Sequence, residues 1–317
     1  MVGRGMKLQQ LRYFREVTRR RLNISEPAMA LHTSQPGISK QIQLLEEELG
    51  VTLFVRQRNR LIELTPAGAA ILEVADRILS DAENIRSIAA DFKDERRGVL
   101  SVVTTHTQAS FTLPRIFKQF KALYPHVNLL LRQGTPNQIW QLVRDRAADI
   151  AIASEPIDRS ADVVMLPCYE LARVVLTPAD HPLLRLKKIS LRQLAEYPII
   201  TYDDGYIAYR NAMRIFVQSG IAPTVVLSAT DSNVMKSHVA AGLGVAIIAN
   251  LAFDRKRDRN LRSIDVGHLF PANKIYVGFR RDVHLRRYVF DFIHALAPHL
   301  TSEFVIRYTG HAELLPR

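Results

Sequence analysis

Residues 32–50 read HTSQPGISKQIQLLEEELG, which has the pattern of a capped amphipathic helix. Ser34 is a favourable N-cap, Pro36 suits the first turn, and Gly50 suits the residue after the last turn. The apolar residues recur every three or four positions on one side: Ile38, Ile42, Leu45 and Leu49. The spacing therefore predicts a helix over Gln35–Leu49 with one buried and one polar face.

The polar face of this predicted helix carries side chains that suit the major groove of DNA. Gln35, Ser39 and Gln43 are spaced by four, and Lys40 lies beside them. A glutamine amide pairs with adenine through two hydrogen bonds, and a serine hydroxyl contacts bases or phosphate. We therefore expect a recognition helix, and its predicted DNA contacts are Thr33, Ser34, Gln35, Pro36, Ser39, Lys40 and Gln43.

The flanking residues complete a winged helix-turn-helix pattern. Apolar residues recur at helical spacing from Leu8 to Val17, and Ser25 is the expected N-cap of a second short helix. Two strand-like runs follow, Val51–Val55 and Leu61–Leu64. The turn between them is basic, which predicts a wing on the DNA backbone or minor groove, with a solvated hairpin tip as the alternative. The predicted wing contacts are Arg56, Arg58 and Arg60.

A long helix is predicted from Thr65-Pro66 onward. Its apolar residues alternate steps of four and three over about three heptads: Ile71, Ala75, Ile78, Ala82, Ile85, Ala89 and Phe92. Such a helix either packs on its own domain or pairs two chains. Pairing is the favoured interpretation, because the helix joins two regions and has little else to bury against.

From Val99 to Leu296 strand patterns alternate with helix patterns, which predicts an α/β fold with mostly parallel sheets. The expected strands are Val99–Thr104, Val127–Leu131, Asp149–Ala153, Pro198–Thr201, Val225–Ser228 and Val245–Ala249. The expected helices are Phe111–Tyr124, Gln138–Arg146, Asn211–Ser219, Asp231–Ala241 and Leu285–Leu296. The tail Thr301–Arg317 shows no clear pattern.

Polar side chains directly follow two of these strands. Thr105, Thr107 and Gln108 come after the first strand, and Ser154 comes after the third. Ligands of open α/β sheets bind at the carboxyl ends of strands. Hydroxyls, an amide and helix N–H groups can hold a small oxyanion without any cation. The alternative is that these hydroxyls only cap helices.

Composition narrows the class of protein. The 317 residues suit two or three domains, and the net charge of +12 attracts polyanions. One cysteine, Cys168, excludes a disulfide within the chain, and Met1–Arg21 is polar and basic. No run approaches the ~18 apolar residues that span a bilayer. We expect a cytoplasmic protein without a membrane partner.

Motifs of enzymes are absent from the sequence. There is no zinc-ligand spacing, phosphate-binding loop or nucleophile elbow, so we expect no metal, no cofactor and no catalytic residue. Gly242 and Gly244 are expected in a packing turn, and His106 is expected to be structural or to contact the ligand. Cys168 is expected to be buried beside Tyr169, with a reactive thiol as the alternative.

The N-terminal segment resembles the DNA-binding domain of LysR-type transcription regulators. The matching motifs are LRYF (11–14), HTSQPGISKQI (32–42), LE (45–46), LG (49–50), LFVR (53–56) and LTPAG (64–68). The rest resembles the CysB-like branch of that family, which activates cysteine-regulon and sulfonate genes. Those motifs are TTHTQ (104–108), QGTP (133–136), DIAIASE (149–155), LPCY (166–169), DHPL (180–183), YPIITY (197–202), TD (230–231) and GLGV (242–245).

The resemblance implies an α/β protein with a winged helix-turn-helix, a linker helix and a two-lobed effector domain like a periplasmic binding protein. The implied division is residues 6–65 for DNA binding, 66–97 for the dimerisation helix, 98–300 for the effector domain and 301–317 for the tail. The first lobe takes residues 98–167 and 268–300, and the second takes 168–267. A free solute-binding protein is disfavoured, because it has no helix-turn-helix.

The resemblance also implies partners and a role. The expected partners are double-stranded promoter DNA, RNA polymerase and further copies of the chain, in a dimer or tetramer formed by the linker helix and effector domains. The expected role is activation of sulfur-assimilation and cysteine-biosynthesis genes. Regulation of alkanesulfonate or taurine use is the alternative.

Regulators of this branch bind sulfate or an acylated serine between the lobes. The matching effector-binding positions are Thr105, Thr107, Gln108, Gly134, Thr135, Ser154, Thr201 and Thr230. One departure is Ile207, which stands where the branch offers a hydroxyl, close to Asp203 and Asp204. Carboxylates oppose a dianion and suit an ammonium group. O-acetylserine or N-acetylserine is therefore at least as good an expectation as sulfate.

Overall fold

The computed structural model describes residues 5–20, 22–58, 60–93, 95–156 and 160–309. The chain divides into two compact units. Unit 1 comprises residues 1–90 with 282–284, and unit 2 comprises residues 91–281 with 285–317. Within the described ranges no helix is both long and apolar enough to cross a membrane.

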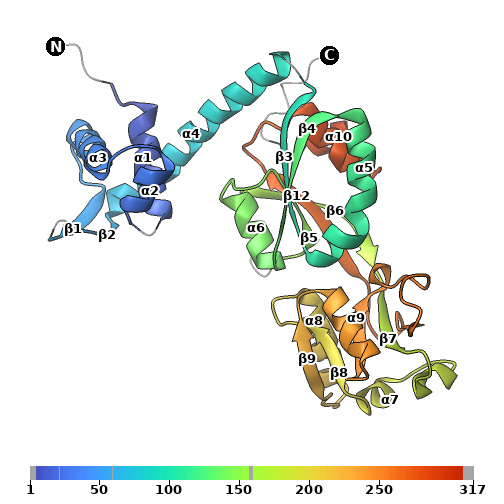
Figure 1. Ribbon diagram of the computed structural model, residues 1–317. Coiled ribbons are helices and arrows are strands. Elements are labelled where there is room, and N and C mark those ends of the chain that lie inside the picture. The colour runs from blue at the N-terminus through green and yellow to red at the C-terminus, as the bar shows by residue number, and fades with distance from the viewer. Residues whose placement is uncertain (1–4, 21, 59, 94, 157–159, 310–317) are drawn as a thin grey trace. The chain divides into compact units, whose positions relative to one another are not determined.

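Unit 1 is a winged helix-turn-helix (Figure 1). Its elements are α1 (Leu8–Arg19), α2 (Ser25–Ala30), α3 (Gln35–Leu49), β1 (Phe54–Gln57), β2 (Arg60–Leu64) and α4 (Pro66–Lys93). The core forms where the apolar faces of α1 and α3 meet, with Phe14, Ile38 and Leu45 fully buried. Helix α3 has the predicted bounds, because the Ser34 hydroxyl accepts from the Gly37 N–H at 3.2 Å and Gly50 ends it at φ 68°.

Two local predictions in unit 1 were wrong. Ser25 is the first helical residue of α2 instead of its N-cap, and its N–H donates to the Asn23 side chain at 2.8 Å. The first strand begins at Phe54 instead of Val51. The Leu53 N–H donates to the Glu46 carboxylate at 2.8 Å, so it is not available for strand pairing.

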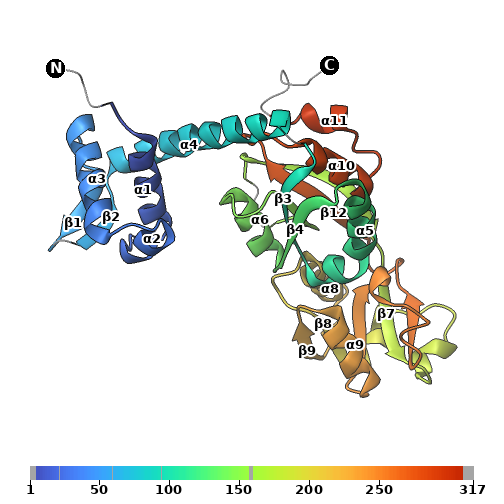
Figure 2. The same cartoon turned by 45° about the horizontal axis from the view of Figure 1, so that its top comes forward.

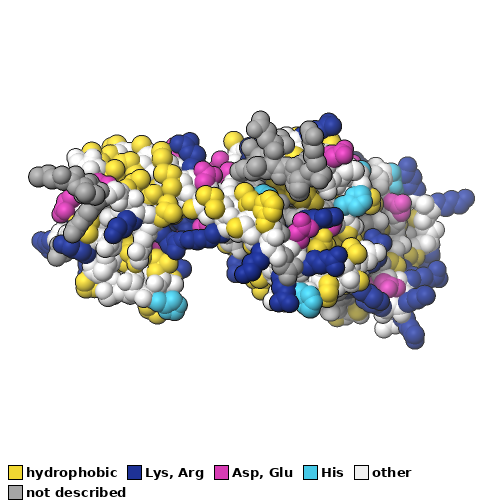
Figure 3. Space-filling model, turned by 90° about the horizontal axis from the view of Figure 1, so that it is seen from above, with side chains coloured by type: hydrophobic (Ala, Val, Ile, Leu, Met, Phe, Trp, Pro, Cys, Tyr) yellow, Lys and Arg dark blue, Asp and Glu magenta, His cyan; other side chains and the backbone are white. Residues whose placement is uncertain are grey.

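Helix α4 divides its apolar seam between two environments. It begins as predicted, with the Thr65 hydroxyl accepting from the Gly68 N–H at 2.9 Å. Ala75 and the adjacent Leu79 are buried in the core of unit 1. In the second half Ile85 is 67% exposed and Phe92 is 88% exposed. Figure 3, which looks down on α4, shows hydrophobic side chains exposed along it. The first half of the seam therefore packs on its own unit, whereas the seam residues Ile85 and Phe92 of the second half are exposed.

Unit 2 contains two five-stranded sheets, each with helices on both faces (Figure 1, Figure 2). The first sheet has the strand order β4-β3-β5-β12-β6. Its strands are β3 (Arg97–Thr104), β4 (His126–Gln133), β5 (Ile150–Ser154), β6 (Val163–Leu171) and β12 (Asn273–Arg280). One face packs on α5 (Leu113–Leu123) and α10 (Arg287–Leu296), and the other packs on α6 (Pro136–Arg144).

The second sheet has the strand order β11-β7-β10-β8-β9. Its strands are β7 (Arg173–Pro178), β8 (Ile199–Tyr202), β9 (Val225–Ala229), β10 (Val245–Ala249) and β11 (Leu261–Asp265). One face packs on α7 (Leu191–Ala195) and α8 (Ile207–Gln218), and the other packs on α9 (Ser232–Ala240). Short turns of helix are η1 (Gln108–Thr112), η2 (Pro182–Arg185) and η3 (Asn250–Ala252).

The sheets are mixed, which corrects the expectation of mostly parallel strands. Strand β3 is parallel to β4 and β5, and β8 is parallel to β9 and β10. Strands β12 and β7 pair antiparallel with both of their neighbours. The tail also differs from expectation: α11 (Ser302–Ile306) is capped by the Thr301 hydroxyl and buries Val305. Residues 310–317 of the tail lie outside the described residues.

Candidate DNA-binding and effector sites

The predicted recognition residues lie together on the outer face of α3. Ile38, Ile42 and Leu45 point into the core, which leaves the opposite face to solvent. The predicted contacts that are exposed there are Ser34, Gln35, Pro36, Lys40 and Gln43, and those that are half-buried are Thr33 and Ser39. The first turns of α3 thus present amides, a hydroxyl and one cation on a convex surface, as major-groove recognition requires.

The wing arginines have two different environments. The Arg56 guanidinium pairs with the Glu46 carboxylate at 2.8 Å. The same carboxylate accepts from the backbone N–H groups of Leu53 at 2.8 Å and Phe54 at 3.3 Å. Glu46 therefore fastens the wing to α3, a contact that the sequence did not predict. Arg58 and Arg60 are exposed at the hairpin tip, and neither has an ion-pair partner among the described residues.

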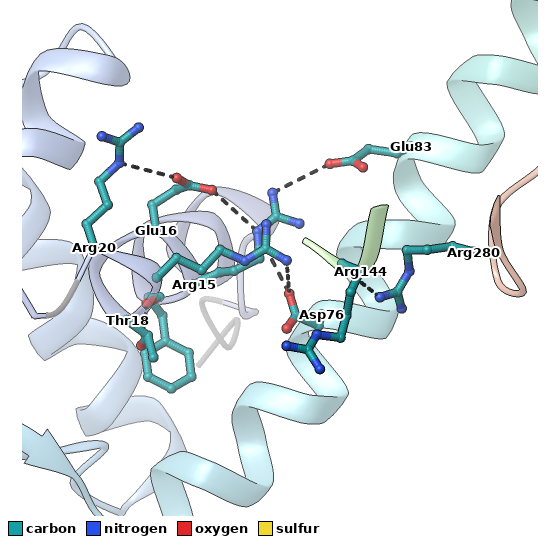
Figure 4. A network of polar contacts seen from close by, with 10 residues as sticks. Arg15, Glu16, Thr18, Arg20, Asp76, Glu83, Arg144 and Arg280 are labelled. Atoms are coloured by element: carbon teal, nitrogen blue, oxygen red, sulfur yellow. Dashed lines mark hydrogen bonds and ion pairs between the residues drawn. The ribbon is translucent and has the colours of Figure 1, made fainter. Parts of the chain in front are cut away.

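A network of charged side chains joins α1 to α4 (Figure 4). Arg15 on α1 is 7% exposed. Its guanidinium lies 3.6 Å from the Glu16 carboxylate, 3.9 Å from Asp76 and 3.5 Å from Glu83. A buried cation surrounded by carboxylates restricts how the helices that carry them can move. The contacts with Asp76 and Glu83 therefore hold α4 against the helix-turn-helix.

Three strand ends meet at one edge of the first sheet. Thr104 pairs with Ile152 on β5 and with Gln133 on β4, so β3, β4 and β5 end side by side. Two hydrogen bonds hold this edge: Thr104 Oγ1 to the Ile152 carbonyl at 2.6 Å, and the Gly134 N–H to the Thr104 carbonyl at 3.1 Å. The predicted effector-binding residues that this edge brings together are Thr105, Thr107, Gln108, Gly134, Thr135 and Ser154.

The hydroxyls at this edge differ in whether they have partners. Thr105, Thr107 and Ser154 are each less than a tenth exposed, and their hydroxyls have no hydrogen-bond partner among the described residues. Thr135 caps α6, where its hydroxyl accepts from the Gln138 N–H at 3.5 Å. Capping therefore accounts for Thr135, and the other three hydroxyls remain available to a ligand.

The side chain of Gln108 is held so that its amide nitrogen is available to donate a hydrogen bond to a ligand. Its side-chain oxygen accepts from the Tyr169 hydroxyl and from the Thr112 hydroxyl, both at 2.6 Å. Gln108 also begins η1, a π-helix that runs to Thr112 before α5 starts. Irregular helical turns of this kind are frequent at functional sites. The arrangement presents neutral donors, which suits an oxyanion or a carboxylate.

Thr201 lies on the second sheet, and Thr230 directly follows β9 of that sheet. Thr201 is on β8 and is 1% exposed, and the Thr230 carbonyl accepts from the Tyr206 hydroxyl at 3.3 Å. The loop after β8 approaches the first sheet, since a Cβ on Gly205 would lie 3.7 Å from a methyl carbon of Thr135. Asp203 is half-buried there and its carboxylate accepts from the Gly205 N–H at 3.0 Å.

Two residues at which this sequence departs from the CysB-like branch are placed by the structure. Asp204 is exposed, and Ile207 is the first residue of α8.

The single cysteine and the glycine turn also have clear environments. Cys168 is buried, and burial raises its pKa to about 12, which disfavours the thiolate that a reactive cysteine needs. A Cβ on Gly244 would lie 2.3 Å from the Pro198 carbonyl, which confirms the packing turn. The described residues contain no cluster of metal-ligating side chains.

Comparisons with known proteins agree with both halves of this description. Residues 8–69 match the family described as bacterial regulatory helix-turn-helix protein, lysR family. Residues 93–301 match the family described as LysR substrate binding domain.

Individual relatives cover nearly the whole chain. The HTH-type transcriptional regulator SsuR of Burkholderia cenocepacia is 44% identical, over 94% of this chain and 96% of its own. The regulator CysB of the same organism is 42% identical, over 95% and 96%. The crystal structure of the cofactor-binding domain of the Cbl transcriptional regulator superposes with a TM-score of 0.65 at 37% identity, over 68% of this chain and 94% of that one.

Proposed function

Since the chain belongs to the LysR family of bacterial transcriptional regulators, we propose that it activates sulfur-assimilation or cysteine-biosynthesis genes in response to a small effector. The observation that carries the effector site is the edge of the first sheet where three buried hydroxyls lack partners. The similar proteins SsuR and CysB are named as transcriptional regulators, and the N-terminal residues match a helix-turn-helix family. The chain is therefore a DNA-binding regulator and not an enzyme.

The proposed effector is a serine derivative, such as O-acetylserine or N-acetylserine, or sulfate. The donors at Thr105, Thr107 and Gln108 are neutral and suit a carboxylate or sulfate oxygen. The half-buried Asp203 adds a negative charge close to Thr135. That charge favours a ligand with a free amine, which O-acetylserine has and N-acetylserine and sulfate lack.

A second candidate is regulation of alkanesulfonate or taurine use. The chain is as similar to SsuR as to CysB, and the resemblance to this branch implies either set of genes. Genome-wide mapping of the bound promoters separates the two roles, because they differ in the genes that lie downstream.

We further propose how the parts cooperate. Residues 6–65 bind promoter DNA, residues 66–97 pair two chains, and residues 98–300 bind the effector between two lobes, 98–167 with 268–300 and 168–267. The exposed second half of α4 supports pairing in a homodimer or homotetramer, to which the effector domains contribute. The protein acts in the cytoplasm and contacts RNA polymerase at its promoters.

Titration calorimetry of the full chain with O-acetylserine, N-acetylserine and sulfate tests the effector site. Thr107→Ala is expected to weaken binding of the true effector about tenfold, because it removes one buried hydrogen bond. Thr224→Ala removes an exposed hydroxyl and serves as the control. Basal promoter binding of Thr107→Ala should equal that of the unaltered chain. Unchanged effector affinity in Thr107→Ala would place the site elsewhere.

A further inference from the structure

Arg173, at the start of β7, is a buried cation without a counter-ion. The residue is 6% exposed, and no described carboxylate forms an ion pair with it. The guanidinium carbon of Arg173 lies 5.7 Å from the ring centroid of Tyr202. Burial lowers the pKa of Arg173, against the effect of Tyr202. A buried charge in this state is unfavourable unless an opposite charge joins it.

The guanidinium lines a small cavity between α8, the second sheet and the loop before β12. The cavity has room for about one water-sized particle, about 10 Å³. Its apolar wall includes Ile215, Ile247 and Phe270. None of the lining residues is acidic.

Each polar side chain of the lining can donate a hydrogen bond, and none of them carries a negative charge. Besides Arg173 and Tyr202 the polar lining contains Thr201, Asn211 and Asn273. Thr201 is 1% exposed and Asn273 is 7% exposed, so both are withdrawn from bulk water. The side-chain oxygen of Asn211 accepts from Arg214 at 3.2 Å, which leaves its amide nitrogen to donate. A full positive charge among donors, with no carboxylate, has the chemistry of an anion site.

We propose that Arg173 and the donors around it bind a small monovalent anion, at a site distinct from the hydroxyls that follow β3. The cavity holds about one water-sized particle, which suits a halide ion, whereas acetate, with four heavy atoms, is too large for it. Arg173 opens β7 directly after β6, and Asn273 opens β12. Both residues therefore lie on the two segments where the chain crosses from one sheet to the other. The bound anion stabilises these crossing segments. This inference is independent of which effector the threonines bind.

Thermal unfolding of the full chain without DNA tests the site. The buffer salt is sodium gluconate, whose anion is too large for the cavity. Sodium chloride replaces it in one series and sodium acetate in another, at constant ionic strength. The unfolding midpoint should rise and saturate with chloride, whereas acetate should act like gluconate. Arg173→Met should weaken the apparent affinity about tenfold to a hundredfold, as expected for a lost charge-assisted hydrogen bond. Arg192→Met, an exposed arginine of α7, should respond like the unaltered chain.

A second variant keeps the test decisive if Arg173→Met does not fold. Asn273→Asp places a carboxylate in the same cavity, so it should remove the anion dependence and raise the midpoint measured in gluconate. Crystals soaked in bromide should show an anomalous peak beside Arg173. Saturation by chloride alone identifies the halide site. No saturation by chloride, saturation by acetate, equal saturation in Arg173→Met, or a soaked crystal without the peak would each overturn the proposal.

Discussion

At the scale of single residues, Glu46 holds the wing in place. Its carboxylate accepts from two backbone N–H groups in the buried segment Leu53-Phe54 and pairs with Arg56. The position of the wing therefore depends on a side chain of α3, the predicted recognition helix.

Glu46→Ala is expected to destabilise the chain by about 1–3 kcal/mol, because it leaves buried N–H groups unpaired. Glu46→Gln keeps a neutral acceptor and should lose less. Glu47→Ala, at the next and exposed position, should change the free energy of unfolding very little. Urea denaturation of the three variants measures these differences. Equal stability of Glu46→Ala and Glu47→Ala would show that water replaces the carboxylate without cost.

At the scale of elements, α4 combines two functions that its heptad spacing did not separate. The first half of the seam packs on the helix-turn-helix, and the Arg15 network adds polar contacts to Asp76 in the first half and to Glu83 in the second. The second half exposes Ile85 and Phe92. Packing on the same domain, one of the two interpretations that the sequence left open, therefore applies to the first half, and pairing of chains stays a prediction for the second.

The double variant Ile85→Asp, Phe92→Asp is expected to lower the oligomeric state without lowering the unfolding temperature of the monomer. Burying aspartate in a helix pair is unfavourable, whereas the same residue on an exposed helix is tolerated. Glu73→Asp is the control, since it is an exposed position in the first half of α4. Sedimentation velocity reports the oligomeric state. An unchanged sedimentation coefficient would mean that chains associate through other surfaces.

The elements also show what the sequence can and cannot predict. The fully buried strands β5 and β10 are nearly continuous apolar runs, and they were predicted to within about one residue. Strand β6 alternates buried and exposed residues and was missed, because its partner β12 lies about a hundred residues away. The polar residues after β3 and β5 were predicted, since strand ends carry local signals. Arg173 was not, because its burial depends on α8 and on the loop before β12.

At the scale of the whole molecule, the net charge of +12 comes from basic side chains whose environments differ. In the wing, Arg56 forms an ion pair with Glu46, whereas Arg58 and Arg60 have no ion-pair partner among the described residues. Arginines without a carboxylate partner in the protein are best placed to displace counter-ions from DNA phosphates. The salt dependence of promoter binding should therefore distinguish residues that hold the backbone from residues that read bases.

Arg58→Ala with Arg60→Ala is expected to weaken binding to all duplexes and to reduce the slope of log affinity against log salt by about 2. Gln35→Ala should instead lower affinity for the promoter by about tenfold to a hundredfold, leave random duplex binding unchanged, and keep the slope. Fluorescence anisotropy of labelled DNA at several salt concentrations measures both quantities. A loss that is equal on all duplexes for Gln35→Ala would refute its base-reading role.

Trp140 is the sole tryptophan of the chain, and its indole N–H donates to the Ser154 carbonyl at 2.9 Å. It packs against Gly278, where a Cβ would lie 2.1 Å from a ring carbon, so the indole is wedged tightly in place. Fluorescence that is excited selectively at this tryptophan therefore comes from a side chain hydrogen-bonded to Ser154, which is a proposed effector contact. Its emission offers an intrinsic, label-free optical readout of effector occupancy, suited to following binding in real time.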